Sequence, residues 1–225
     1  MNKWTLRTAA AACLAAVALT GLTAPAEARQ TTTTGATGTA TGAVRTTATV
    51  TVPYISRTRI DGVWTPIEGY TRDYTVTAPA TVEPGGDFRV RFDSAPIFAV
   101  PAHNKTLTDL RIAYRVSGDA TVLRYRLEGG SNLGGAHFWV ERNGSDLVLR
   151  SNGTFQGGVE FDVPDLVVKV RAGATGTVTT SPGGSSFADP AFYWYREQTV
   201  SGQWDPFENY VDPASPVTFT TTTIG

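Results

Sequence analysis

The stretch Phe88-Arg89-Val90-Arg91-Phe92-Asp93 alternates large apolar and charged side chains at every position. Successive side chains of a β-strand point to opposite faces, so this period of two predicts a strand with one buried face and one exposed face. From Val44 onward, similar short runs are separated by Gly, Pro, Asn and Asp, and no window keeps a helical apolar period over three turns. About ten to thirteen such strands predict an all-β fold, an antiparallel β-sandwich.

The segment before this strand is Thr77-Ala-Pro-Ala-Thr-Val-Glu-Pro-Gly-Gly86. A proline-containing first strand and a Pro-Gly turn that lead into an alternating strand resemble the entry to secreted bacterial immunoglobulin-like β-sandwich domains. The Ala-rich start of the chain and the Thr/Gly-rich segment after it are similar to those of exported actinobacterial proteins. The resemblance implies an immunoglobulin-like sandwich and no specific named family.

A first hairpin is expected at Gly118-Asp119, read as a two-residue turn. This register places the bulky apolar residues of both strands on one face, as a buried sheet face requires. The expected pairs are Val116 with Thr121, Tyr114 with Leu123, Ile112 with Tyr125, and Leu110 with Leu127.

A second hairpin is expected at Asn143-Gly144, a dipeptide that favours tight turns between strands. This register pairs Val140 with Leu147 and Phe138 with Leu149 on the core face, and it places His137 opposite Arg150. A third turn at Asn152-Gly153 would disturb the alternation, so the strand after it either contains a bulge or pairs elsewhere.

The start of the chain has the pattern of an export signal. Lys3 and Arg7 precede the apolar run Ala9 to Leu22, and Ala26-Glu27-Ala28 has the small-x-small form of a signal-peptidase site. We therefore expect a secreted, extracellular protein whose signal peptide is cleaved after Ala28. A retained membrane anchor is the alternative, but the apolar run is short for a membrane span, and no later run is longer.

Three segments follow from this pattern. Residues 1–28 are the signal peptide, residues 29–43 are a flexible Thr/Gly/Ala spacer, and residues 44–225 are a single sandwich domain. Cys13 is the chain's one cysteine and lies in the signal, so the mature protein has no disulfide and no cysteine-ligated metal. The formal net charge of −1 predicts no nucleic-acid partner and no anionic membrane surface.

The most specific signal is an internal repeat. Residues 62–70, GVWTPIEGY, match residues 202–210, GQWDPFENY, at a constant offset of 140 residues. One interpretation is a duplicated structural hairpin at two related edges of one fold, with the aromatic residues packed. The other is a pair of exposed platforms whose rings stack on sugars while the glutamates accept hydroxyl protons. The candidate ligand-binding residues are Trp64, Glu68, Tyr70, Trp204, Glu208 and Tyr210.

Groups that would indicate catalysis or a cofactor are scarce. His103 and His137 are the two histidines, and no metal-ligand spacing, nucleophile elbow, phosphate loop or dinucleotide motif is present. We predict no catalytic residues, no metal and no cofactor. Carboxylates that could serve a glycosidase lie on exposed strand positions, without a distinguishable pair. They are Glu128, Glu141, Glu160, Asp162 and Asp165.

The predicted first hairpin also has a basic outer face, with Arg111 expected opposite Arg126 and an acidic residue two positions from each. One interpretation is a ladder of ion pairs that contributes little net stability. Binding of an anionic cell-wall polymer is the other. The arginines of this face are Arg111, Arg115, Arg124 and Arg126.

Export, near-neutral charge and the absence of catalytic groupings together predict a secreted, non-catalytic binding or surface-interaction protein. The partner would be a cell-wall glycan or another surface protein. An extracellular carboxylate-based polysaccharide hydrolase and a carrier of a small apolar ligand between the sheets are the alternatives. A sandwich fold alone does not choose among them.

Overall fold

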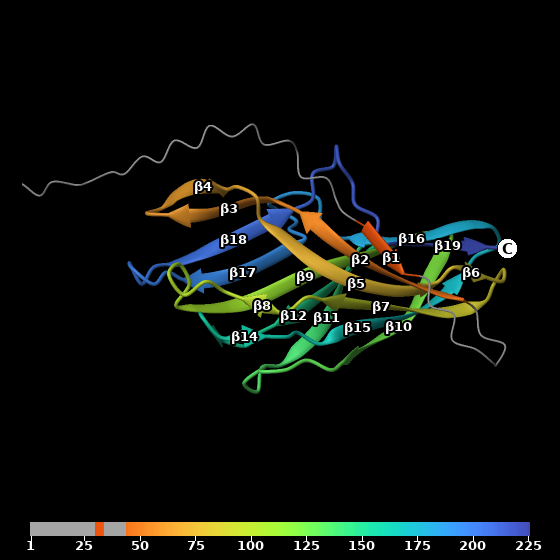
Figure 1. The fold of residues 1–225 in the computed structure, drawn as a ribbon, viewed down its shortest axis with the longest axis horizontal. Helices are drawn as coiled ribbons and strands as arrows, with labels where there is room; N and C mark the ends of the chain where they lie inside the picture. Colours follow the sequence, from red (N-terminus) through yellow and green to blue (C-terminus); the bar gives the residue numbers. More distant parts are fainter. Residues whose placement is uncertain (1–29, 34–43) are drawn as a thin grey trace, which may run out of the picture.

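The computed structural model describes residues 30–33 and 44–225. The predicted signal peptide and most of the predicted spacer lie outside these ranges, while Gln30–Thr33 forms the first strand. Within the described residues every regular element is a β-strand, and no helix is long and apolar enough to cross a membrane. The strands form two large sheets that lie face to face, so the predicted all-β sandwich is confirmed (Figure 1).

The smaller layer is a six-stranded antiparallel sheet in the order β1-β2-β5-β7-β15-β10. The alternating stretch that predicts the fold is its strand β7, in which Phe88, Val90 and Phe92 are buried and Arg89 and Arg91 are exposed. The strands are β1 (Gln30–Thr33), β2 (Arg45–Pro53), β5 (Thr71–Pro79), β7 (Asp87–Ser94), β15 (Asp165–Ala172) and β10 (Ala120–Glu128).

The larger layer is an eleven-stranded sheet in the order β4-β3-β18-β17-β9-β16-β19-β6, with all pairs antiparallel except β19 with β6. Its long strand β9 also pairs with β12 and β13 along its other edge, and β12 pairs with β11. The strands are β4 (Val63–Ile67), β3 (Ile55–Ile60), β18 (Trp204–Tyr210), β17 (Phe192–Glu197), β9 (Thr106–Gly118), β16 (Gly176–Pro182), β19 (Thr220–Ile224), β6 (Thr81–Val82), β11 (Phe138–Asn143), β12 (Asp146–Ser151) and β13 (Phe155–Gln156).

One apolar core joins the inner faces of the two sheets. Tyr74 and Phe92 from the six-stranded sheet meet Tyr114 from β9, with ring centroids 6.1 and 4.7 Å apart, and Phe219 closes this group. The Tyr74 hydroxyl lies 2.7 Å from that of Tyr54, so each buried hydroxyl has a hydrogen-bond partner. A small sheet of β8 (Ile97–Phe98) and β14 (Glu160–Phe161) lies beside this core (Figure 1).

The predicted first hairpin does not form. Strand β9 lies in the larger sheet and β10 lies in the smaller one beside β15, so Val116 does not pair with Thr121, nor Ile112 with Tyr125, nor Leu110 with Leu127. Tyr114 is 1% exposed, whereas Leu123 is 39% exposed.

The reason for the crossover lies at Gly118. This glycine has a φ of +100°, and a Cβ atom there would lie 2.1 Å from the Thr177 carbonyl oxygen. Only glycine tolerates this combination of close approach and positive φ. It lets the chain leave one sheet and enter the other, instead of turning back on itself.

The predicted second hairpin forms with its register shifted by two residues. Val140 pairs with Leu149 and Phe138 with Ser151, because the turn residues are Gly144-Ser145 and Asn143 pairs with Asp146. A shift of two leaves each side chain on its predicted face. His137 consequently does not face Arg150, which pairs with Trp139. The strand after the third turn pairs elsewhere, with β9.

Candidate functional site

The repeated motif forms two neighbouring hairpins of the larger sheet. The first copy begins at the turn between β3 and β4, and the second at the turn between β17 and β18. Strand β18 also pairs with β3, so the hairpins lie side by side at one end of the sheet (Figure 1). The prediction of two related edges is correct for β4 only, because β18 is an interior strand.

A row of directly paired positions crosses the outer face of this sheet over seven strands. Neighbouring strands lie about 4.8 Å apart, so the row extends over about 29 Å. In this row, two charged side chains lie between each ring-containing side chain and the next. From β4 to β11 its members are Pro66, Arg57, Glu208, Tyr193, Arg111, Arg150 and Trp139.

Arg57 organises the end of the row at the two hairpins. Its guanidinium carbon lies 3.8 Å from the ring centroid of Trp64 and 3.9 Å from that of Phe187. Its Nε donates a hydrogen bond to the Glu208 carboxylate over 2.7 Å. The ring of Tyr210 meets Phe187 edge-on at 4.8 Å. Trp64 and Phe187 thereby flank one cation on the outer face, and Tyr210 joins this cluster through Phe187.

A second aromatic pair lies near the turn of β17 and β18. The rings of Tyr195 and Trp204 stack at 5.6 Å, and the Tyr195 hydroxyl donates to the Trp204 carbonyl oxygen at 3.1 Å. Trp204 is 40% exposed. An aromatic face that is oriented by a neighbour and open to water is available for stacking on a ligand.

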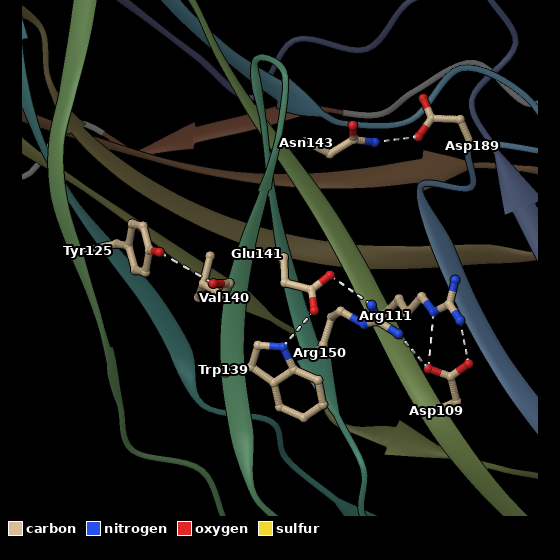
Figure 2. Close-up of polar contacts among 9 residues, drawn as sticks. All are labelled: Asp109, Arg111, Tyr125, Trp139, Val140, Glu141, Asn143, Arg150 and Asp189. Carbon is tan, nitrogen blue, oxygen red and sulfur yellow. Dashed lines mark hydrogen bonds and ion pairs between the residues drawn. The ribbon is translucent and has the colours of Figure 1, made fainter.

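The far end of the row is an ionic network on β9, β11 and β12. Asp109 accepts from Arg111 and from Arg150, and Glu141 accepts from Arg150 at 2.7 Å and from the Trp139 indole at 2.9 Å (Figure 2). The hydrogen bond from Trp139, followed by that from Arg150, lowers the pKa of Glu141. The indole is thereby held flat beside the imidazole of His137, with centroids 5.7 Å apart.

Asp109 reaches this network because β9 contains a bulge. Its φ of +49° is a left-handed conformation, and the pairing of β9 with β17 shifts between Tyr193 and Tyr195 at this point. The extra residue turns the Asp109 carboxylate towards the outer face, where the Arg111 side chain also lies over the Tyr193 ring at 4.5 Å.

The structure gathers four of the six predicted ligand-binding residues on this face. Trp64, Trp204, Glu208 and Tyr210 lie on it, whereas Tyr70 points into the core. The Tyr70 ring meets Phe207 edge-on at 4.9 Å, and burial raises its pKa to about 12. Glu68 is exposed outside β4 and takes no part in the cluster.

Sequence reasoning missed several residues of this face, because their cross-strand neighbours were unknown. A usable signal was present in Phe192-Tyr-Trp-Tyr195, where both faces of one strand are aromatic. An aromatic face left over after the core has been filled points to contact with a partner. The missed residues are Arg57, Tyr193, Tyr195, Trp139, Arg150 and Phe187.

The predicted opposition of Arg111 and Arg126 is wrong, because β9 and β10 belong to different sheets. Arg111 pairs with Arg150 and Tyr193, and Arg126 pairs with Val167. Each arginine does bind the expected acidic neighbour, Arg111 to Asp109 and Arg126 to Glu128, both at 2.5 Å.

Among the candidate carboxylates, some are held by arginines, while Asp162 and Asp165 lie near each other and near Asp93. Asp165 contacts Arg91, and Glu141 contacts Arg150. Asp93, which the sequence did not single out, has a pKa raised to about 6 by burial and by the charges of Asp165 and Asp162. Within the described ranges, no group of three His, Cys, Asp or Glu residues could hold a metal ion.

An apolar cavity of about 330 Å³ lies on the inner side of the two hairpins, beneath the segment 98–104. Phe98 is 54% exposed at this cavity, and Ile60 and Val100 are exposed beside it. Arg196 also lines it, is almost fully buried, and donates to the His103 carbonyl oxygen at 3.0 Å. Burial lowers the Arg196 pKa, and Asp205 opposes that shift.

Comparison with known proteins shows a fold and nothing narrower. No family model matches the chain, and no curated protein matches it. Among solved structures, the chain is similar to a protein of Corynebacterium diphtheriae described as "Putative membrane anchored protein", with a TM-score of 0.51 and 13% identity. The similarity covers 79% of this chain and 37% of that one, so this chain spans little more than a third of its neighbour's length.

Proposed function

We propose that this chain is an exported, non-catalytic carbohydrate-binding protein that contacts its ligand with the outer face of the two repeated hairpins. The single observation that supports this most strongly is the seven-strand row of rings and charged groups, with Trp204 exposed and Trp64 and Tyr210 half-buried beside it. A fixed, extended surface of this kind suits a chain of sugars better than it suits a compact small molecule.

The chemistry of this face matches what a sugar offers. Ring faces of Trp204 and Trp64 suit the C–H faces of a sugar, while Glu208 and Arg57 supply an acceptor and donors for hydroxyl groups. The Glu208 side chain is 14% exposed and the Arg57 side chain 29% exposed, so each remains reachable from solvent. Because the two already bind each other, the surface is pre-organised and loses little entropy on binding.

Export belongs to the same proposal. The signal-like residues 1–28 and the cysteine-free mature chain support secretion. The neighbour from Corynebacterium diphtheriae is described as membrane anchored, which is compatible with a place at the cell surface. We include in the proposal that the sandwich is immunoglobulin-like, and that its partner is a cell-wall glycan.

Retention of the mature chain, residues 29–225, on insoluble polysaccharides and on a glycan array tests this proposal. The variants are Trp204→Ala and Trp64→Ala, and we expect each to bind at least tenfold more weakly, because stacking on one ring contributes on the order of 1.4 kcal/mol or more. Phe98→Ala is the matched control, since it removes an exposed ring away from this face.

Folding of each variant is checked by its thermal unfolding midpoint. Folded Trp204→Ala and Trp64→Ala variants with undiminished retention would remove this face from consideration. An equal loss in Phe98→Ala would also count against it, because the effect would then not depend on the face.

The cavity beneath segment 98–104 supports a second candidate function, the carriage of a small apolar ligand. Its apolar walls and the exposed Phe98, Ile60 and Val100 at its rim are typical of an interaction site. A fatty acid is a suitable probe, because the buried Arg196 could meet its carboxylate. Here Phe98→Ala should weaken binding and Trp204→Ala should not, which is the reverse of the order expected for the glycan.

A further inference from the structure

Three cations occupy directly paired positions on the outer face of the other, six-stranded sheet. Arg124 of β10 pairs with Lys169 of β15, and Lys169 pairs with Arg89 of β7. Directly opposite residues on neighbouring strands have Cβ atoms about 5 Å apart, and like charges at such positions repel. Solubility alone does not require three cations at directly opposite positions.

Acidic neighbours neutralise part of this face but leave its centre uncompensated. Asp87 binds Lys169 at 2.6 Å and Arg171 at 2.8 Å, Glu128 binds Arg126, and Asp165 binds Arg91. Arg89 and Arg124 form no ion pair within the described part of the chain, and both are exposed. Six cations therefore share the face with Asp87, Glu128 and Asp165, and with Asp93 at the end of β7. The cations are Arg89, Arg91, Arg124, Arg126, Lys169 and Arg171.

The face is hollowed where the cations meet. A cavity of about 220 Å³ is lined by Arg89, Arg124, Arg126 and Lys169, together with Val167. Val167 pairs with Arg126 on one side and with Arg91 on the other, so a short apolar side chain lies between two arginines. The guanidinium groups thereby surround a depression that an anionic group can enter.

We propose that this cationic face binds a linear polyanion, a polymer whose phosphate or carboxylate groups are repeated along its length. Arginine binds both groups bidentately, and a row of cations across three strands presents one charge about every 5 Å. The chain as a whole has a formal charge of −1, so this attraction is local. The site lies on the opposite sheet from the aromatic face and is independent of it.

A nucleic acid is the less suitable polyanion. Single strands are held by aromatic rings on which bases stack, in addition to cations. Tyr125 is the aromatic residue at this hollow, but it pairs with buried Val168, and its hydroxyl donates to the Val140 carbonyl oxygen at 3.3 Å. Its hydroxyl therefore points to Val140 of β11, which leaves the ring fixed by this contact (Figure 2).

The test measures binding of the mature chain to polyphosphate and to polygalacturonate as a function of salt. We expect Arg89→Gln/Arg124→Gln to weaken binding at least tenfold at 50 mM salt, and to lower the slope of log affinity against log salt by about 1.5 to 2. Arg142→Gln is the matched control, because Arg142 is exposed on β11 and forms no ion pair within the described residues. It should change the affinity less than twofold.

Stability provides a second readout. Because the double substitution relieves repulsion of Lys169 from both sides, the thermal midpoint should stay unchanged or rise. Tighter binding of polyphosphate than of polygalacturonate would show that the site selects phosphate groups. Equal binding of the two would show that it recognises the density of negative charge, and either result supports the proposal. Full affinity in the double variant, an equal loss in Arg142→Gln, or tighter binding of single-stranded DNA than of either polymer would overturn it.

Discussion

The Arg57 Nε donates a 2.7 Å hydrogen bond to the carboxylate of Glu208, a residue 151 positions away in the sequence. This bond joins the two hairpins. Each of the two residues belongs to, or pairs with, one copy of the repeated motif. Arg57 is also enclosed by the rings of Trp64 and Phe187, so one guanidinium both bridges the hairpins and orients their aromatic residues. The duplication therefore has a structural role even though it also produces an exposed surface.

Substitution of this pair should separate its contribution to stability from its contribution to binding. We expect Arg57→Gln and Glu208→Gln each to lower the free energy of unfolding by about 1 kcal/mol, because the pair is only partly exposed and charge-assisted. Urea unfolding of both single variants and the double variant gives the coupling, expected at about 0.5 to 1 kcal/mol. A coupling indistinguishable from zero would mean that the bridge does not join the hairpins energetically.

Gly118 should be the costliest glycine to replace among those with positive φ values. Gly118→Ala adds both left-handed strain and an overlap with the Thr177 carbonyl oxygen, so we expect a loss of at least about 3 kcal/mol. Gly176→Ala is the matched control, because its φ of +93° is similar but nothing lies within 4 Å of the added Cβ. It should cost about 1 kcal/mol. Equal losses in thermal or urea unfolding would show that the crossover does not depend on close approach.

Gly118 also shows why part of the fold could not be predicted. Alternation in β9 and β10 correctly indicates two strands that begin and end near this glycine, but alternation specifies a buried face and not the strand that lies alongside. In a sandwich, both sheets bury a face against the same core, so Tyr114 and Leu127 fit a hairpin and a crossover equally well. The deciding contact, Gly118 against Thr177, joins distant parts of the chain.

The residues of the candidate site were likewise predictable only in part. The repeat identified Trp64, Trp204 and Glu208, because a shared nine-residue pattern is visible in one sequence. Trp139 and Arg150 join the same face only through the pairing of β9 with β12, which no local pattern specifies. The second hairpin was found from its glycine, and its faces were correct because its register differed by an even number of residues.

Asp93 should make stability depend on pH in a definite direction. Its pKa is raised to about 6 from an ordinary value of 3.8, first by burial and then by Asp165 and Asp162. Between these two values the folded state binds more protons than the unfolded state, so the free energy of unfolding falls as pH rises from about 4 to about 6. Asp93→Asn should remove this fall, which we expect to be on the order of 1 kcal/mol.

Urea unfolding at pH 4.5 and pH 7 measures the difference between the wild type and Asp93→Asn. Asp87, whose pKa is lowered to about 2 by hydrogen bonds from Arg171 and then Lys169, acts in the opposite direction, but only below about pH 4. The chosen window therefore excludes it. An unchanged pH dependence in Asp93→Asn would show that this carboxyl does not titrate near pH 6.

Arg115 and Asp146 should respond unequally to substitution, although they form one ion pair. Asp146 is almost fully buried and accepts hydrogen bonds from Arg115 at 2.5 and 2.9 Å and from the Gly184 amide at 2.7 Å. Arg115→Gln leaves a buried carboxylate without its cation, so we expect a loss of about 3 kcal/mol. Asp146→Asn leaves an arginine whose side chain is 33% exposed and can reach water, so we expect a loss of about 1 to 2 kcal/mol.

Urea unfolding of the two variants shows which substitution lowers the free energy of unfolding more. Faster hydrogen exchange at the Gly184 amide in Asp146→Asn gives a local readout. The reverse order of losses would mean that the carboxylate acts as a hydrogen-bond acceptor for the backbone and not as the counter-ion of Arg115.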